Sequence, residues 1–115
     1  MLPKKNRLTS PADFVRTTKS GVRVGSDNFV AYLYKSDEPQ PPRAGLIISK
    51  SVGNSVIRHR VGRRVRHVLA ERINEFTQGT LFVVRALDGA SKADTHSEIT
   101  KLIPRAHEKQ ASVHR

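Results

Sequence analysis

The sequence contains no cysteine and no long run of apolar residues. Without cysteine there is neither a disulfide framework nor a Cys-based zinc site. No apolar stretch approaches the roughly 18 residues that a membrane span requires. The first ten residues, MLPKKNRLTS, are too polar for a secretory signal peptide. The 115 residues are expected to form one domain, 1–115, with a single core, and these features fit a cytoplasmic protein.

Acidic residues are scarce, and one long region has none. Lys and Arg number 21 against 10 Asp and Glu, which gives a formal net charge of +11 and a pI near 10.9. From Pro39 to Ala70 there is no acid, and the basic residues in that interval are Arg43, Lys50, Arg58, Arg60, Arg63, Arg64 and Arg66. A uniformly solvated surface would mix the two signs of charge. The expected partner is therefore a polyanion, whose condensed counterions are released when its phosphates are neutralised.

The titratable residues form no grouping typical of an active site. The carboxylates are scattered, with no obvious D-x-D or E-x-K nuclease grouping. The histidines show no i,i+4 pair, so no helix-borne metal site is predicted. Asp37 and Glu38 are expected to form a solvated turn, and His96, His107 and His114 to lie on the surface. We therefore predict no catalytic and no metal-binding residue in the protein.

Local signals predict the element order α-β-β-β-α-β-α, an α+β sandwich in which helices pack on one four-stranded sheet. Ser10, as N-cap before Pro11, starts the first helix, and Gly79 ends the long one. The predicted elements are a helix at 10–18, strands at 22–24, 27–34 and 43–50, a helix from Asn54 or Ser55 to about 76, a strand at 80–87, and a helix from Ser91 to about 103. Residues 104–115 are expected to be a loosely ordered tail.

Two of the predicted strands carry informative apolar patterns. The strand at 43–50 is nearly continuously apolar, as expected of a central strand covered on both faces. The strand at 27–34 alternates between two faces. One face carries Phe29, Ala31 and Leu33, and the other carries Val30, Tyr32 and Tyr34. The all-apolar face is expected to form the core under the long helix.

The long helix is amphipathic, with an apolar face and a cationic flank. The apolar residues spread over one broad face and are Ile57, Val61, Val65, Val68, Leu69 and Phe76. The cationic residues of the flank are Arg60, Arg63, Arg64 and His67. Arg66 is expected to point more nearly away from the core. The apolar face must pack on the sheet, and the flank is left for another role.

A solvated helix surface is the alternative interpretation of this flank. Solvated helices usually place Glu or Asp one turn from their basic residues, and here the first acid is Glu71. Like charges one turn apart repel, so the cluster weakens the free fold unless a partner compensates it. Arginine also binds phosphate oxygens through two parallel hydrogen bonds. These features favour an RNA or DNA backbone over plain solvent, and the helix N-terminus offers free N–H groups as well.

At these residues the sequence resembles the bacterial ribonuclease P protein subunit family. The resemblance rests on SKSVGNSVIRHRVGRRVR at Ser49–Arg66, where a strand ending in Ser-Lys and a Gly-Asn turn precede a basic helix. The Lys5–Leu8 segment, the helix containing Phe14 and the strand Phe29–Tyr32 match in order and spacing. The likeness covers about residues 4–103.

Several positions depart from the family pattern. His59 stands where Asn is usual, and Ser55 where Ala is usual. Gly62 stands at a position that is generally basic, which removes a charge and costs up to about 1 kcal/mol of helix propensity relative to Ala. Arg64, at a position that is often apolar, restores the charge. Thr18 replaces a second aromatic one helical turn beyond Phe14, so weaker stacking of the leader is expected.

The resemblance implies a fold, a function and two binding sites. The fold is that of a ribosomal-protein domain with a left-handed crossover between the third and fourth strands. The function is to assist a catalytic RNA that removes the 5′ leader from precursor tRNA. The residues implied to bind the catalytic RNA are Lys50, Asn54, Arg58, His59, Arg60, Arg63, Arg64, Arg66 and His67. The residues implied to line a cleft for the single-stranded leader are Arg7, Phe14, Val30, Tyr32, Tyr34 and Ser49.

The implied partners are the catalytic RNA and precursor tRNA, without a membrane or a required protein partner. The resemblance implies that the protein binds no cofactor and that the RNA holds the Mg²⁺ ions of the reaction. Two other functions remain open at this point. One is a purely structural RNA binder, such as a ribosomal protein of similar fold. The other is a metal-dependent nuclease that acts without an RNA subunit.

Overall fold

The computed structural model describes residues 2–113, so the surface position predicted for His114 lies outside the described residues. In chain order the helices and strands are α1 (Pro11–Ser20), β1 (Val22–Gly25), β2 (Phe29–Lys35), β3 (Arg43–Ile48), α2 (Ser55–Arg72), β4 (Thr80–Ala86) and α3 (Thr95–Val113). Short 3-10 helices are η1 (Lys4–Asn6), η2 (Lys50–Val52), η3 (Ile73–Glu75) and η4 (Asp88–Lys92). The predicted element order and α+β class are confirmed.

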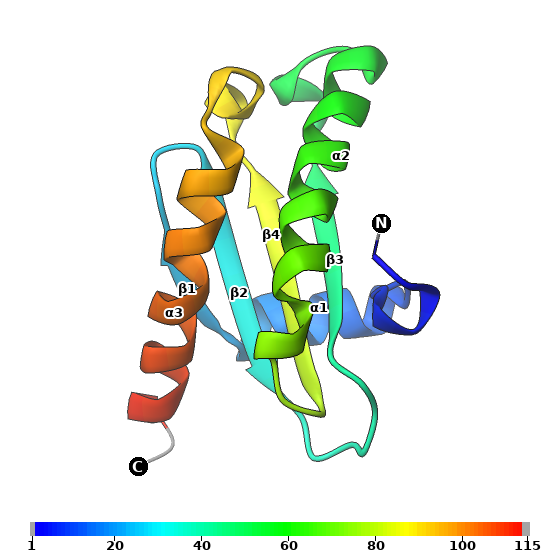
Figure 1. Cartoon of the computed structure of the whole chain (residues 1–115), viewed down its shortest axis with the longest axis vertical. Helices are drawn as coiled ribbons and strands as arrows, with labels where there is room; N and C mark the ends of the chain where they lie inside the picture. The colour runs from blue at the N-terminus through cyan, green and yellow to red at the C-terminus, as the bar shows by residue number, and fades with distance from the viewer. Residues whose placement is uncertain (1, 114–115) are drawn as a thin grey trace.

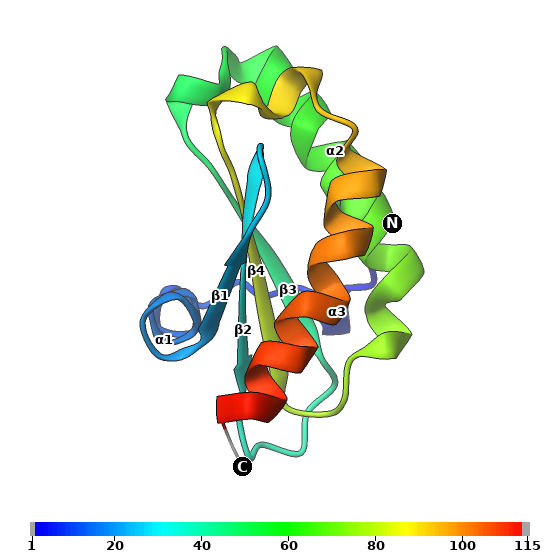
Figure 2. The ribbon, with the colours of Figure 1, turned by 90° about the vertical axis from the view of Figure 1, so that its left-hand side faces the viewer.

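The four strands form one mixed sheet in the order β1-β2-β4-β3. β2 pairs antiparallel with both β1 and β4, whereas β3 lies parallel to β4. Figure 1 shows β4 to the left of β3, with both strands pointing upwards and α2 in front of them, and Figure 2 places α2 on that same side. This connection is a left-handed crossover, as the family resemblance implies and against the usual preference for right-handed ones.

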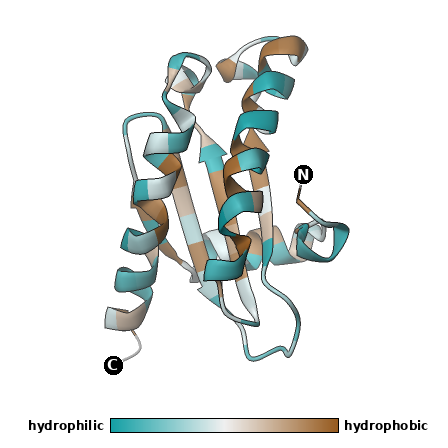
Figure 3. Cartoon of the chain, in the orientation of Figure 1, coloured by the Kyte–Doolittle hydropathy of each residue, from teal (hydrophilic) through white to brown (hydrophobic). Residues whose placement is uncertain are grey.

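The sheet lies between two unequal helical layers. Figure 2 shows α2 and α3 side by side on one face and α1 alone on the other. The larger core lies under α2 and α3 and includes Phe29, Ala31 and Leu33 of β2. Figure 3 shows hydrophilic residues along the outer sides of α2 and α3 and hydrophobic residues along the strands behind them. The apolar face predicted for 27–34 is thus confirmed as core.

A smaller core lies on the opposite face of the sheet, under α1. It contains Val30 and Tyr32, with Phe14 and Tyr34 packed against it. Gly45 of β3 makes room for Phe14, because a Cβ atom built at Gly45 would lie 2.5 Å from Phe14 Cζ. The second face predicted for 27–34 is confirmed as well, and α1 reaches it through Phe14.

The prediction of a central position for the third strand was wrong, because β3 is an edge strand and β4 is central. Both faces of β3 are nevertheless covered. Leu46 and Ile48 pack against the larger core, and Ile47 packs against the smaller one. Beyond β3 an isolated bridge pairs Arg7 with Ala44, and Leu8 N–H donates to the Ala44 carbonyl at 2.9 Å. A continuous apolar run indicates that both faces of a strand are buried. It does not indicate whether both edges of the strand pair with neighbouring strands.

The predicted end of the last helix was also wrong. α3 continues through Pro104 to Val113, so the described part of the expected tail is helical. Contacts with the rest of the fold hold these turns in place: Ala106 is fully buried, and the ring of His107 lies 5.2 Å from that of Phe76. Arg105 and Lys109 donate to carbonyls of β1 at 2.9 and 2.8 Å. His107 is therefore partly buried rather than a surface residue.

The remaining element ends differ by a few residues. α3 is capped by Asp94, whose Oδ1 accepts the Ser97 N–H at 3.1 Å, and Ser91 lies in η4. α2 ends at Arg72 and passes into η3, so Gly79 is in the turn before β4. Ser10 occupies the N-cap position of α1, but its hydroxyl makes no capping hydrogen bond. Within residues 2–113 no helix is both long and apolar enough to span a membrane.

Candidate nucleic-acid interface

The cationic helix α2 starts at a well-formed cap. Asn54 Oδ1 accepts the N–H of Ile57 at 3.0 Å, and the Asn54 carbonyl accepts the N–H of Arg58 at 2.9 Å. The Arg58 side chain folds back, and its Nε donates to the Gly53 carbonyl at 3.2 Å. Asn54, one of the residues implied to bind RNA, therefore has a clear structural role as the cap of the helix.

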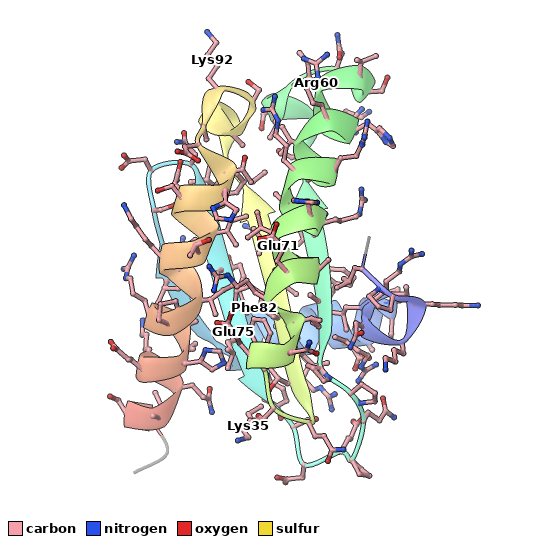
Figure 4. All side chains as sticks on the ribbon, viewed as in Figure 1. Lys35, Arg60, Glu71, Glu75, Phe82 and Lys92 are labelled. Carbon is pink, nitrogen blue, oxygen red and sulfur yellow. The ribbon has the colours of Figure 1, made fainter. Side chains whose placement is uncertain are left out.

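The flank predicted from helical spacing exists. Arg60, Arg63, Arg64 and His67 are exposed and line one hollow between α2 and the start of α3. Arg64 reaches across and donates to the Ser91 carbonyl at 3.2 Å. Figure 4 shows Arg60 near the upper end of α2 and Lys92 at the tip of the neighbouring η4. Four of the nine residues implied to bind RNA are thus brought together on one surface.

Two arginines outside α2 have acidic partners. Arg16 and Arg43 each contact both Asp13 and Glu38, at 3.1 to 3.6 Å. These contacts join α1, β3 and the proline-rich loop into one charge network. The prediction of a merely solvated turn at Asp37 and Glu38 was therefore wrong for Glu38. Its carboxylate contacts both Arg16 and Arg43 and helps to neutralise their charge.

The arginines of α2 between Arg58 and Arg66 differ from these. Among residues 2–113 no carboxylate oxygen lies within 4.0 Å of any of their guanidinium nitrogens. The nearest acid along the helix, Glu71, contacts His67 Nε2 at 3.0 Å instead. Their mutual repulsion is not relieved by ion pairing within the described chain, so this surface favours an external anion.

Arg66 does not point away from the core, contrary to the prediction from helical spacing. It is half-buried on the other flank of α2, where its guanidinium lies close to Gly62. There it lines a second hollow of about 390 Å³ together with Arg7, Leu8 and Phe14. The cause is tertiary, because the edge of β3 lies beside this flank. The implied RNA-binding residues therefore divide between the two sides of α2, and Lys50 and His59 are exposed near its start.

The residues implied to line the leader cleft do not share one cavity among the described residues. Arg7 and Phe14 line the hollow at the β3 edge, where Arg7 Nε donates to the Leu2 carbonyl at 3.0 Å. Tyr34 lies under the guanidinium of Arg16, 5.2 Å from Cζ to the ring centroid. Ser49 is exposed beyond β3, with its hydroxyl 2.7 Å from that of Ser51.

Arg85 is a candidate that the sequence reading missed. It is exposed on β4, its Cζ lies 5.8 Å from the centroid of the Tyr32 ring, and its sheet neighbours are Val30 and Ile47. Val30 and Tyr32 are themselves buried. Figure 2 shows α1 over only part of this face of the sheet. The signal in the sequence that could have identified Arg85 is that it is the one charged residue in the strand TLFVVRA.

The described residues contain no group of three His, Asp or Glu side chains arranged to hold a metal ion. Two histidines meet at one carboxylate, however. His67 Nε2 lies 3.0 Å from one oxygen of Glu71, and His96 Nε2 lies 3.4 Å from the other. His96 is exposed, as predicted.

Comparison with known proteins agrees with this architecture. The family model described as Ribonuclease P matches residues 2–108. The ribonuclease P protein component of Mycobacterium sp. (strain KMS) is 40% identical over 110 residues, covering 92% of this chain and 93% of its own. That of Beutenbergia cavernae is 42% identical over 101 residues, covering 88% and 84%.

Solved structures show the same fold. The RNase P protein of Staphylococcus aureus superposes with a TM-score of 0.70 at 26% identity, covering 97% of each chain. The RNase P protein of Thermotoga maritima gives a TM-score of 0.73 at 22% identity, covering 86% of this chain and 96% of its own. With the family match over nearly the whole sequence, these likenesses show that the chain belongs to the bacterial ribonuclease P protein family.

Proposed function

We propose that this chain binds the catalytic RNA of ribonuclease P through α2 and assists the removal of the 5′ leader from precursor tRNA. Family membership implies a role in tRNA 5′ processing. The observation that carries the finer proposal is the row of α2 arginines from Arg58 to Arg66, none of which has a carboxylate partner among the described residues, whereas Arg16, Arg43 and Arg72 do. Phosphates of a folded RNA would supply the missing negative charge.

In this proposal the RNA and its Mg²⁺ ions carry out hydrolysis in the cytoplasm, and the protein positions the substrate. The open part of the sheet face beside α1 is the proposed contact for the leader. Arg85 offers a charge for a phosphate there, and its guanidinium lies over the ring of Tyr32, which is itself buried. An unpaired base of the leader can stack on the plane of the exposed Arg85 guanidinium.

A cleavage assay tests the function directly. The protein is mixed with ribonuclease P RNA and precursor tRNA at low Mg²⁺, and leader release is compared with that by RNA alone. The proposal expects faster release with the protein present. Tight RNA binding without faster release would instead indicate a structural RNA binder. Cleavage by the protein without RNA would indicate a nuclease in its own right.

A salt titration of RNA binding tests the role of α2. The logarithm of the binding constant falls with the logarithm of salt concentration in proportion to the phosphate contacts made. Arg60→Ala or Arg63→Ala should flatten this slope by about 0.7–0.9 per lost contact. Lys101→Ala, at an exposed position of α3, is the control and should leave the slope unchanged. An unchanged slope and an unchanged affinity in the α2 variants would mean that these arginines form a solvated helix surface and do not contact RNA.

A further inference from the structure

The hollow between α2 and the start of α3 is large enough for a small ligand. Its volume is about 690 Å³, which is within the range of small-molecule sites. Arg60, Arg63 and Arg64 line it from α2, and Val68 and Ala93 give it an apolar part. Helical spacing predicted the α2 side alone, since the opposite wall comes from residues some 30 positions later in the chain.

The end of the hollow beyond the arginines has different chemistry. His67 of α2 and His96 of α3 line it, and both imidazoles contact Glu71 through Nε2, at 3.0 and 3.4 Å. Figure 4 shows Glu71 between the two helices, below Arg60. A carboxylate only accepts hydrogen bonds, so it favours a proton on Nε2 of both rings. In the neutral rings Nδ1 is then left as an acceptor.

This asymmetry selects among anionic ligands. Phosphate fits the arginine end, where guanidinium groups bind phosphate oxygens in pairs. A second phosphate at the other end would meet the carboxylates of Asp94 and Glu71. A planar, hydrogen-bonding group fits there instead, because unstacked bases are bound on aromatic rings, including that of His. The matching ligand has one phosphate and one base.

We propose that this hollow binds a single nucleotide of an RNA strand, with its phosphate against the arginines and its base against His67 and His96. Glu71 is a positioning residue that fixes the orientation and tautomer of both rings. The inference rests on the proposed function, because the nucleotide belongs to the RNA that α2 binds. The nucleotide site extends the RNA interface of α2 to residues of α3. It also makes that interface prefer RNA with an unpaired base at this position.

Amide NMR titration of the whole protein with small probes tests the site. The probes are AMP, GMP, CMP and UMP, with ribose 5-phosphate as the probe that lacks a base. At least one nucleotide should bind about fivefold or more tightly than ribose 5-phosphate, given the usual strength of base stacking. The shifts should centre on Val68, Ala93 and His96. Equal affinity for ribose 5-phosphate, or shifts confined to other surfaces, would overturn the proposal.

Variants separate the two ends of the hollow. His96→Ala and Glu71→Gln should remove most of the preference for nucleotide over ribose 5-phosphate. Glu71→Gln should also change the side-chain ¹⁵N shifts of both rings, which a merely structural role would not require. Arg63→Ala should weaken both probes alike. Glu108→Gln, an exposed acid later on α3, is the matched control and should behave as wild type. Retained preference in His96→Ala would contradict the assignment of the base.

The same preparations are then used in the leader-cleavage assay. If wild-type protein accelerates leader release but shows no nucleotide preference, the proposed function stands and the nucleotide site is rejected. If it neither accelerates leader release nor shows a nucleotide preference, the proposed function and the nucleotide site are both rejected. His96→Ala should reduce the affinity of the protein for ribonuclease P RNA at least threefold, which is less than the usual loss when a stacking contact is removed. Glu108→Gln should leave this affinity unchanged.

Discussion

Gly62 interrupts the basic run of α2 for a reason that lies in the packing. The residue is buried, and a Cβ built there would lie 3.1 Å from a terminal nitrogen of Arg66 and 3.4 Å from Ile48 Cδ1. It therefore faces the edge of β3 rather than the cationic flank of α2. A larger basic side chain at this position would have to displace Ile48 or leave the helix–sheet contact.

Replacing Gly62 by alanine is expected to stabilise the fold. Alanine favours the helix by up to about 1 kcal/mol relative to glycine. The closest atom belongs to the flexible end of Arg66, which can move by a few tenths of an ångström. Urea unfolding of Gly62→Ala should show a gain approaching that amount. A loss of stability would mean that Ile48 or Arg66 cannot move aside.

Gly45 has the opposite sensitivity. A Cβ there would lie 2.5 Å from Phe14 Cζ and 3.1 Å from Leu8 Cβ, so the aromatic ring must leave its place on the sheet. Gly45→Ala should cost about 1–3 kcal/mol of stability, as overpacking usually does. In a Phe14→Leu background the same change should cost less, and unfolding measurements on the four proteins give the coupling. Equal costs in both backgrounds would contradict the contact.

At the scale of elements, Glu98 joins α3 to the turn between β1 and β2. Its carboxylate accepts from Ser26 Oγ at 2.6 Å, from Asn28 N–H at 2.9 Å and from Asn28 Nδ2 at 2.7 Å. Partial burial acts to raise the pKa of Glu98, but these hydrogen bonds outweigh it and lower the pKa below its ordinary value. The ionised form is therefore the one that the fold stabilises.

This lowered pKa sets the direction of a pH dependence. The stabilisation is complete above the unfolded-state pKa, near 4.5, and is lost as pH falls through the lower folded-state value. Glu98→Gln should therefore reduce stability by about 1.5–3 kcal/mol at pH 7, the usual contribution of hydrogen bonds to a charged group. The difference from wild type should shrink towards pH 3. Urea unfolding at both pH values measures it, and a constant difference would contradict the assignment.

α3 also shows how contacts override a local signal. Proline within a helix removes one backbone hydrogen bond and crowds the preceding turn. Ile103 before Pro104 and Ala106 two positions after it are buried, whereas Pro104 itself is exposed. Burial of these neighbours and the contacts of Arg105 with β1 offset the local cost. A helix of 19 residues results where the local signal indicated an end.

For the whole molecule, the distribution of charge matters more than its sum. The end of the fold near α1 and the proline-rich loop holds paired charges, whereas the arginines of α2 from Arg58 to Arg66 have no acidic partners among residues 2–113. The free protein therefore carries an electrostatic strain on one side, which a bound anion would relieve.

Sulfate or phosphate should raise the melting temperature of the free protein. A ligand that binds only the folded state stabilises it by about 2.7 kcal/mol at a hundred times its dissociation constant. Thermal unfolding in sulfate should be compared with sodium chloride at equal ionic strength, which controls for general screening. Arg63→Ala should show a smaller rise than wild type. If neither anion raises the melting temperature, the idea that repulsion among the α2 arginines destabilises the free protein is contradicted.

The sequence by itself determined the order and type of the elements, the two faces of β2 and the cationic flank of α2. These follow from periodicity and from charge, which act between residues a few positions apart. It also carried the family resemblance, and with it the left-handed crossover that no local rule predicts.

Only the tertiary structure decided which surfaces meet. It placed β3 at the edge of the sheet, turned Arg66 towards Arg7, and carried α3 through Pro104. It also brought His96 to Glu71, 25 positions away in the chain. Periodicity says which face of an element is buried, whereas the packing of distant elements selects its neighbours. For that reason the second wall of the α2 hollow was absent from the sequence reading.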